Sequence, residues 1–278
     1  MRNVDEKVIR KQTITKYRDG KLEEKVDEIA VEFPFTIHVN GEEFATMVCT
    51  PSHLDELLLG FLASEGIIRS KDDIQDFHID EGKGLCYVTL YHQAPVSQHE
   101  TGKRFIGSCC GKSRQFYYQV DVKTAKTSYS RVILSPKECI RMMRELQDGS
   151  TLFKGTGGVH NAALFLGKDM IVARSDIGRH NALDKLLGHC LIHHIPVRDG
   201  VVAFSGRISS EVLLKAAKIG VGIILSKSAP TNLAIELADD LNITAIGFIR
   251  GGGFNIYSHP ERVKETSIKE CAKFESNK

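Results

Sequence analysis

Apolar and polar positions follow strand patterns in the first third of the chain. Residues 29–33, 35–39 and 44–48 are rich in Ile, Val and Phe, and Asn40-Gly41 separates the second run from the third. Asn-Gly between β-rich runs is a strong hairpin signal. We therefore predict two strands joined at this turn. Residues 1–25 are predicted to form an irregular or edge-strand arm ahead of them.

The pattern then changes to helical spacing. Ser52, with Asp55 three residues later, has the form of a capping box and predicts a helix start. The helix is predicted to stop at Gly66, and two strands are predicted near 74–79 and 85–91. The apolar face of the helix consists of Leu54, Leu57, Leu58, Phe61 and Leu62.

Strands and helices alternate in the second half of the chain. Ser135 and Glu138 form a capping box with Pro136 at the first helical position, which predicts a helix to about Gln147. Further strands are predicted at 162–166, 170–173, 201–204, 222–225, 243–248 and 255–258, and further helices at 180–193, 209–218 and 232–241. Such alternation is typical of a layered α/β sheet with helical crossovers. The predicted fold class is α/β, or α+β over the whole chain.

Three regions follow from these patterns. We predict an N-terminal β-rich domain with one helix over residues 1–98 and a layered α/β domain over residues 135–278. Between them, residues 99–134 form a predicted loop or linker, most of which lacks periodicity. Long loops in compact proteins tend to be functional.

Composition narrows the classes of partner. The chain has 278 residues and a net charge of +2, which does not indicate a nucleic-acid partner. No apolar run approaches the roughly 20 residues of a membrane helix, so no membrane partner is expected. The first 25 residues lack an apolar signal core, which favours a cytoplasmic protein. Seven scattered cysteines fit a reducing compartment better than a disulfide framework.

Two adjacent cysteines, Cys109 and Cys110, stand out within the loop. Gly111 follows them, and Lys112 and Arg114 lie close in sequence. Nearby cations favour the thiolate, which is the reactive form of cysteine, so a nucleophilic cysteine is one interpretation. A partly buried structural thiol and a metal ligand are the others.

No set of cysteines and histidines has the paired short spacings of a structural zinc site. His193 and His194 are adjacent in sequence, so they do not share one helical face. We interpret them as an ordinary pair at a helix end.

Four glycine-rich polar segments fall where strands meet helices or turns: residues 154–161, 175–181, 205–210 and 248–255. Ligands of layered α/β sheets bind at such junctions, where helix N-termini favour anions. Arg179, Arg207 and Arg250 suit phosphate groups. Taken singly, each glycine or serine is better explained by a helix cap or a turn, but the four junctions together predict an anionic, nucleotide-like ligand.

Taken together, segments 156–164, 176–185, 205–211 and 247–250 resemble the FdhD/NarQ family of formate dehydrogenase accessory proteins, from about residue 32 to 257. The resemblance implies a sulfurtransferase that receives sulfur from a cysteine desulfurase as a cysteine persulfide. It implies transfer of that sulfur to the molybdenum bis(molybdopterin guanine dinucleotide) cofactor of a client formate dehydrogenase. A C-terminal domain like cytidine deaminase and a homodimer are also implied.

The cysteine loop departs from the pattern of the family, which commonly reads Ser-Ser-Cys-Gly-x-Cys-Gly. Its first Cys-Gly step aligns with Cys110-Gly111, which leaves Ser113 at the position of the second cysteine. Cys110 is therefore the predicted persulfide carrier, and Cys109 is the second candidate. The zinc signature of the deaminases, His-x-Glu with Pro-Cys-x-x-Cys, is absent, so no tightly bound zinc is expected.

The resemblance also implies which residues hold the cofactor. Segment 248–253 matches the cofactor-binding segment of the family, with backbone N–H groups around Gly178 and Gly206 assisting. His160 and His180 are expected to be polar contacts or proton carriers. The predicted cofactor contacts are Gly178, Arg179, His180, Ser205, Gly206, Arg207, Phe248, Ile249, Arg250, Gly251, Gly252 and Gly253.

Three other functions remain open on the sequence. The first is a chaperone that binds the cofactor without sulfur chemistry. The second is a thiol–disulfide oxidoreductase that uses the adjacent cysteines, although a disulfide between neighbouring residues is strained. The third is a zinc hydrolase of the deaminase type.

Overall fold

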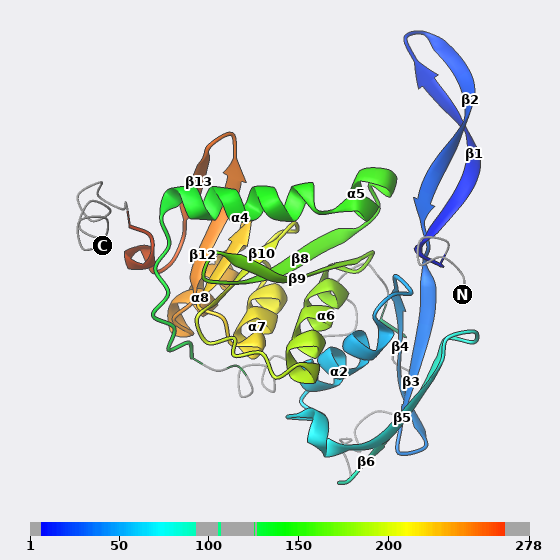
Figure 1. Cartoon of the computed structure of the whole chain (residues 1–278), viewed down its shortest axis with the longest axis horizontal. Coiled ribbons are helices and arrows are strands. Elements are labelled where there is room, and N and C mark those ends of the chain that lie inside the picture. Colours follow the sequence, from blue (N-terminus) through cyan, green and yellow to red (C-terminus); the bar gives the residue numbers. More distant parts are fainter. Residues whose placement is uncertain (1–6, 93–104, 107–124, 126, 265–278) are drawn as a thin grey trace, which may run out of the picture.

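The computed structural model describes residues 7–92, 105–106, 125 and 127–264. A two-stranded hairpin, β1 (Ile9–Arg18) and β2 (Lys21–Ala30), projects from the body of the molecule (Figure 1). Of the two predicted alternatives, the edge-strand arm is confirmed, because both strands of a two-stranded sheet are edge strands; the hairpin turn between them was not predicted. Asp19 and Gly20 both have positive φ, at 51° and 83°, which is the geometry of a two-residue hairpin turn. The flanking strands are largely polar, so they lacked the alternation that marks a strand.

A five-stranded sheet follows, in the order β5-β6-β3-β4-β7. The predicted hairpin at Asn40-Gly41 is confirmed, since β3 and β4 pair antiparallel around it. A two-residue strand within the predicted loop, β7, pairs with β4. The bounds are Phe33–Val39 for β3, Glu42–Cys49 for β4, Ile74–Asp80 for β5, Leu85–Leu90 for β6 and Phe105–Ile106 for β7.

Helix α2 (Leu54–Ser64) packs its leucines on this sheet. Its predicted cap was wrong. His53 is the N-cap, with φ at 51° and no side-chain hydrogen bond to the helix. The predicted stop is confirmed by Gly66, which has positive φ.

The remaining strands form a six-stranded sheet in the order β13-β12-β11-β10-β8-β9. Strands β10, β11 and β12 are parallel, whereas β8, β9 and β13 run antiparallel to their neighbours. The strand bounds are His160–Leu166, Asp169–Asp176, Gly200–Phe204, Ile223–Ser226, Thr244–Arg250 and Gly253–Ile256 for β8 to β13.

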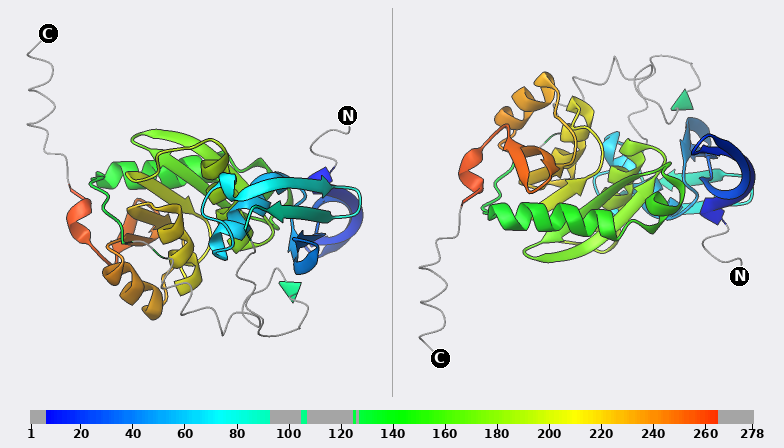
Figure 2. Two further views of the ribbon diagram at one scale, coloured as in Figure 1. Left: turned by 90° about the horizontal axis from the view of Figure 1, so that it is seen from below. Right: turned by 90° about the horizontal axis from the view of Figure 1, so that it is seen from above.

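Helices cover both faces of this sheet (Figures 1 and 2). Helix α4 (Pro136–Asp148) lies on one face and carries the predicted capping box of Ser135 and Glu138. Helices α6 (Arg179–Ile192), α7 (Ser210–Ile219) and α8 (Asn232–Asp240) lie on the other. The layered α/β class is thereby confirmed.

A short helix, α5 (Thr151–Thr156), was not predicted. It follows α4 closely and contacts strand β2. Two 3-10 turns, Lys71–Asp73 and Pro260–Arg262, complete the elements of the described chain. Within that part of the chain, no helix is long and apolar enough to cross a membrane.

The predicted domain limits at residues 98 and 134 stay a prediction, because much of segment 99–134 lies outside the described residues. Its described end is attached to the six-stranded unit. The Ser128 N–H donates to the Leu241 carbonyl, and the Leu134 N–H donates to the Arg262 carbonyl.

Helices α2 and α6 join the two sheet units by packing directly on each other (Figure 1). A Cβ atom at Gly60 would overlap the Asp184 carbonyl, and one at Gly188 would overlap the Glu56 carbonyl. Glycine at both positions therefore allows the two helix backbones to touch.

Candidate functional site

One edge of the six-stranded sheet collects the four polar segments that the sequence singled out. Strands β10 to β12 are parallel, so their carboxyl ends share this edge. Strand β8 runs the other way and begins there, and β9 ends there. Ligands of open α/β sheets bind outside the carboxyl ends of parallel strands. The topology therefore places all predicted cofactor contacts along one edge.

Hydrogen bonds tie neighbouring loops of this edge together. The Ser226 hydroxyl donates to the Gly206 carbonyl at 2.7 Å. The Phe248 N–H donates to the Ser228 carbonyl at 3.3 Å. Ser226, the last residue of β11, and the loop 227–230 after it thus link the segment at Gly206 to the segment at Phe248. The sequence analysis missed this linking loop, although Ser226-Lys227-Ser228 at the end of a strand is the same signal as at the other junctions.

Four cations lie along the edge without acidic partners in the described part of the chain: Arg179, Arg207, Lys227 and Arg250. Arg207, Lys227 and Arg250 are exposed. The guanidinium of Arg250 lies 5.2 Å from the centroid of the Phe248 ring, which holds it by a cation–π contact. Cations that no carboxylate neutralises create a positive surface suited to a phosphate-bearing ligand.

Arg179 is half-buried at the start of α6 and its Nε has no hydrogen-bond partner among the described groups. His160, at the start of β8, stacks on Phe204 with the ring centroids 6.4 Å apart. Burial and the charge of Arg179 lower the pKa of His160, so its imidazole is neutral at pH 7. A neutral imidazole can donate or accept a hydrogen bond at this edge.

The N-terminus of α6 differs from the prediction. The Gly178 N–H, expected to assist an anionic ligand, donates instead to the buried Asp176 carboxylate at 2.8 Å. The Asn181 amide donates to the same oxygen at 3.0 Å. An internal carboxylate therefore already satisfies this backbone donor, so this geometry does not support the expected contact from Gly178, which stays a prediction. His180 pairs with Glu211 at 2.8 Å and links α6 to α7.

The remaining predicted contacts lie in the loop after β10 and along the end of β12 with the turn that follows it. Ser205 hydrogen-bonds with Asn161: its hydroxyl accepts from the Asn161 N–H at 2.9 Å. Ile249 is buried in the core against α4. The turn at Gly251 and Gly252 has positive φ, at 59° and 84°, and Gly253 is exposed with no atom near its missing Cβ. An open glycine turn lets a ligand approach the backbone closely.

Cys109 and Cys110 lie outside the described residues. Four other cysteines are described and all are buried with free thiols: Cys49, Cys86, Cys139 and Cys190. Burial raises the pKa of each of these thiols to about 12. Because the thiolate is the nucleophile, burial disfavours the reactive form of these four cysteines at neutral pH.

One group of described residues, Glu56, His189 and His193, has ligand atoms within 4.8 Å of one another. Arg174 already donates to both oxygens of Glu56, at 2.5 and 2.6 Å. A guanidinium thus holds the carboxylate that a metal ion would need. The absence of tightly bound zinc stays a prediction.

Comparison with known proteins agrees with this arrangement. The FdhD/NarQ family model matches residues 30–264. The sulfur carrier protein FdhD of Bacillus subtilis is 55% identical over 262 residues, covering 94% of this chain and 100% of that protein. FdhD of Staphylococcus haemolyticus is 59% identical over 259 residues, covering 93% of this chain and 98% of that protein.

A solved structure supports the same assignment. The crystal structure of a proposed formate dehydrogenase accessory protein from Desulfotalea psychrophila aligns with a TM-score of 0.75 and 25% identity, over 92% of this chain and 100% of that one. The match of the family model and the identity to the two relatives extend over both sheet units. The chain therefore belongs to the FdhD/NarQ family.

Proposed function

We propose that this protein is a cytoplasmic sulfur carrier that serves formate dehydrogenase. The observation that carries the proposal is membership of the FdhD/NarQ family over residues 30–264, with relatives named sulfur carrier protein FdhD at 55–59% identity. The sulfur donor is a cysteine desulfurase. The acceptor is the molybdenum bis(molybdopterin guanine dinucleotide) cofactor, bound by a homodimer of this chain.

The transfer step needs one thiolate and no external oxidant. The Cys110 thiolate attacks the outer sulfur of a desulfurase persulfide. A new S–S bond forms on Cys110, the S–S bond of the donor breaks, and the donor cysteine leaves as a thiolate. The outer sulfur keeps its proton, so the product is a Cys110 persulfide. Lys112 and Arg114 lie next to the pair in sequence and favour the thiolate form.

The described cysteines support this choice by elimination. Burial raises the pKa of all four to about 12, so their thiolate forms are scarce at pH 7. A carrier must present its thiolate to two partners in turn, and these thiols lie inside the two sheet units. The adjacent cysteines of the predicted loop remain the best candidates.

Intact-protein mass spectrometry tests the proposal. We expect wild-type protein, incubated with a cysteine desulfurase and cysteine, to gain one sulfur (about 32 Da) that a reductant removes. The gain is expected to vanish in Cys110→Ala and to persist in Cys109→Ala. Loss only in Cys109→Ala would move the carrier by one residue.

No gain on any form, with a competent desulfurase, would reject sulfur transfer. The unpaired cations of the sheet edge favour one other function, a cofactor-binding chaperone. In that case a variant with both cysteines replaced by alanine would still support formate dehydrogenase maturation.

The cation edge makes a separate prediction about the acceptor. Replacing Arg207 or Arg250 by alanine removes a guanidinium that has no acidic partner in the described chain, so we expect GDP to bind about tenfold more weakly. Isothermal titration calorimetry measures the affinity. Arg198→Ala is the control, because Arg198 contacts the Tyr129 carbonyl instead of the sheet edge. Unchanged affinity in both variants would refute the phosphate roles.

A further inference from the structure

The body of the protein holds the β1–β2 hairpin at its base. Val8, just before β1, is buried, and its carbonyl accepts from the Val31 N–H at 3.0 Å. Lys7 pairs with Glu81, in the turn between β5 and β6, at 2.6 Å. Beyond this base the two strands project from the molecule (Figure 1).

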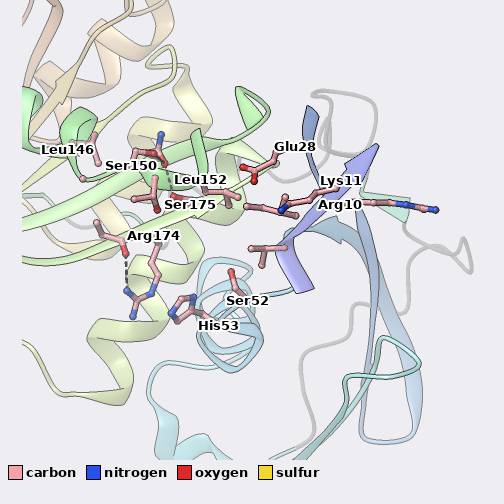
Figure 3. A pocket seen from close by; sticks show the side chains of 16 residues that line it. Arg10, Lys11, Glu28, Ser52, His53, Leu146, Ser150, Leu152, Arg174 and Ser175 are labelled. Atoms are coloured by element: carbon pink, nitrogen blue, oxygen red, sulfur yellow. Dashed lines mark hydrogen bonds between the residues drawn. The ribbon is translucent and has the colours of Figure 1, made fainter. Parts of the chain in front are cut away.

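Helix α5 covers the base of β2 but leaves β1 uncovered. A Cβ atom at Gly155 of α5 would lie 2.8 Å from Glu28 Oε2. Glu28 and Asn161 line a pocket of about 940 Å³ between the hairpin base and α5. Figure 3 shows Glu28 on the side of α5 and the side chain of Arg10, on β1, extending away from it. The uncovered part of the hairpin therefore includes β1 and the tip.

This projecting part exposes large apolar side chains. Tyr17, Leu22 and Val26 are 70%, 71% and 59% exposed. Tyr17 lies opposite Leu22 in the strand register, and Thr13 lies opposite Val26, so all of these side chains share one face. An isolated two-stranded hairpin is at best marginally stable in water, and grouped apolar side chains on a surface are typical of interaction sites. The hairpin thus has the features of a binding arm.

Strand β1 also has an open edge, because within the described chain it pairs with β2 alone. Antiparallel pairs alternate between hydrogen-bonded and non-bonded pairs. The Val8–Val31 pair is bonded, so alternate residues after it direct their N–H and C=O groups to the outer edge of β1. Such a row of unpaired groups is a template for an added strand. The residues with outward groups are Ile9, Lys11, Thr13, Thr15 and Tyr17.

The two strands of the hairpin differ in charge. Strand β1 carries four cations and no acidic residue, whereas β2 carries four acidic residues and two lysines. Arg10, Lys11 and Lys16 form no ion pair among the described residues. Arg18 pairs with its neighbour Asp19 in the turn, at 3.4 Å. Because opposite charges on adjacent strands attract, the edge of β1 suits an acidic strand.

The same charges disfavour two other occupants of this edge. Two-fold pairing with the β1 of a second copy would set four cations against four cations, and like charges on adjacent strands are destabilising. A nucleic acid lying across the hairpin would meet Glu23 and Asp27, which share a face with Lys16. A strand added beside β1 is separated from these acids by β1 itself.

We propose that β1 accepts, as a third strand of the hairpin, an extended segment of a partner protein in which acidic residues alternate with β-branched ones. The segment bonds to the outward backbone groups of β1. Its acidic side chains lie beside Arg10, Lys16 and Arg18 on one face, and its apolar side chains lie beside Thr15 and Tyr17 on the other. This docking surface goes beyond the proposed function, since none of the predicted cofactor contacts and neither candidate cysteine takes part in it.

Fluorescence anisotropy with the full-length protein tests the surface. The probe is a fluorescein-labelled peptide of five Glu-Val repeats, whose ten residues match the length of β1. We expect saturable binding that weakens as salt is added. A peptide of five glutamates followed by five valines has the same composition without the alternation, and a ten-nucleotide thymidine oligonucleotide has the charge without the strand. Both are expected to bind at least about tenfold more weakly.

A proline variant tests the backbone pairing. Thr13→Pro removes an outward N–H of β1 that makes no bond to β2, so the hairpin is kept and we expect about tenfold weaker binding of the alternating peptide. Val26→Pro is the matched control, because Val26 lies opposite Thr13 and its N–H points to the outer edge of β2. It is expected to bind like the wild type, and circular dichroism checks that both variants are folded.

A charge reversal tests the cations without touching the backbone. Arg10→Glu combined with Lys16→Glu is expected to abolish binding of the alternating peptide. Lys21→Glu combined with Lys25→Glu reverses two charges on the same face of the neighbouring strand, and this variant is expected to retain binding.

The proposal would be overturned if the wild type did not bind the alternating peptide, or if it bound the block peptide equally well. Tighter binding of the oligonucleotide would make the arm a nucleic-acid site instead. Unchanged binding in both Thr13→Pro and the Arg10–Lys16 variant would place the peptide elsewhere. If sedimentation showed that the Arg10–Lys16 variant loses a dimer that the wild type forms, the edge would belong to a second copy.

Discussion

Gly188→Ala is expected to destabilise the protein by about 3 kcal/mol or more, at the upper end of overpacking effects. Helices α2 and α6 touch through Gly60 and Gly188, and each missing Cβ would overlap a backbone carbonyl of the other helix. Backbone cannot rotate away as a side chain can, so the helices must separate. Separation also strains the Ser64–Asp184 hydrogen bond of 2.6 Å and the bidentate pair of Arg174 with Glu56.

Urea unfolding followed by circular dichroism measures this loss. Gly60→Ala is expected to behave similarly, because it meets the Asp184 carbonyl. The control is Gly82→Ala in an exposed turn, where the nearest atom to an added Cβ is 3.4 Å away and the expected change is below about 0.5 kcal/mol. Equal midpoints for Gly188→Ala and Gly82→Ala would show that the helices are not in such close contact.

Lys185→Met is expected to cost about 3–5 kcal/mol, because it leaves a buried carboxylate without its cation. Lys185 and Asp176 are both fully buried and their charged atoms are 2.6 Å apart. The Lys185 ammonium also donates to the Thr50 carbonyl at 3.0 Å. The pair therefore holds the end of β4 against β9 and α6, where the two sheet units meet.

A double-mutant cycle separates the pair from its surroundings. We expect Lys185→Met combined with Asp176→Asn to cost clearly less than the sum of the two single variants, because residues in one network are coupled. Lys83→Met serves as the control, since Lys83 pairs with Asp80 at 3.5 Å with its side chain 74% exposed. Solvent screens an exposed pair of this kind, so its loss is expected to change stability very little. Strict additivity of the Lys185 and Asp176 variants would contradict the coupling.

Turn and capping motifs predicted strands and helices correctly where the apolar pattern of the flanking residues indicated the same element. The Asn40-Gly41 turn lies between apolar strands, and the Ser135–Glu138 capping box opens an amphipathic helix. The Asp19-Gly20 turn carries the same kind of signal, but its strands are polar and exposed, so their pattern did not support it. His53 caps α2 in a left-handed conformation without a side-chain hydrogen bond to the helix, so none of the residues that usually mark an N-cap stands at this position.

The position of the candidate site could be predicted, because alternating strands and helices indicate a layered α/β sheet whose strand–helix junctions meet at one edge. Parallel strands carry their carboxyl ends to one edge, so the segments at Arg207 and Arg250 share it. The segment at Arg179 reaches the same edge because β9 pairs antiparallel with β8, which is itself antiparallel to β10. Whether each backbone N–H at this edge is free or already hydrogen-bonded within the protein could not be predicted. The Gly178 N–H is satisfied by Asp176, which the sequence had grouped with it as part of the same polar segment.

The sequence by itself determined the family, the layered α/β class and the edge of the sheet where cations gather, because motifs and periodicity are local properties of the chain. Only the tertiary structure decided which polar groups remain unpaired. Glu28 and Asn161 come from elements far apart in the chain, and they line one pocket only after the hairpin lies against α5. Hydrogen bonding and burial depend on such distant neighbours. The sequence therefore marked Asn161 as part of a polar segment but did not show which residues it would contact.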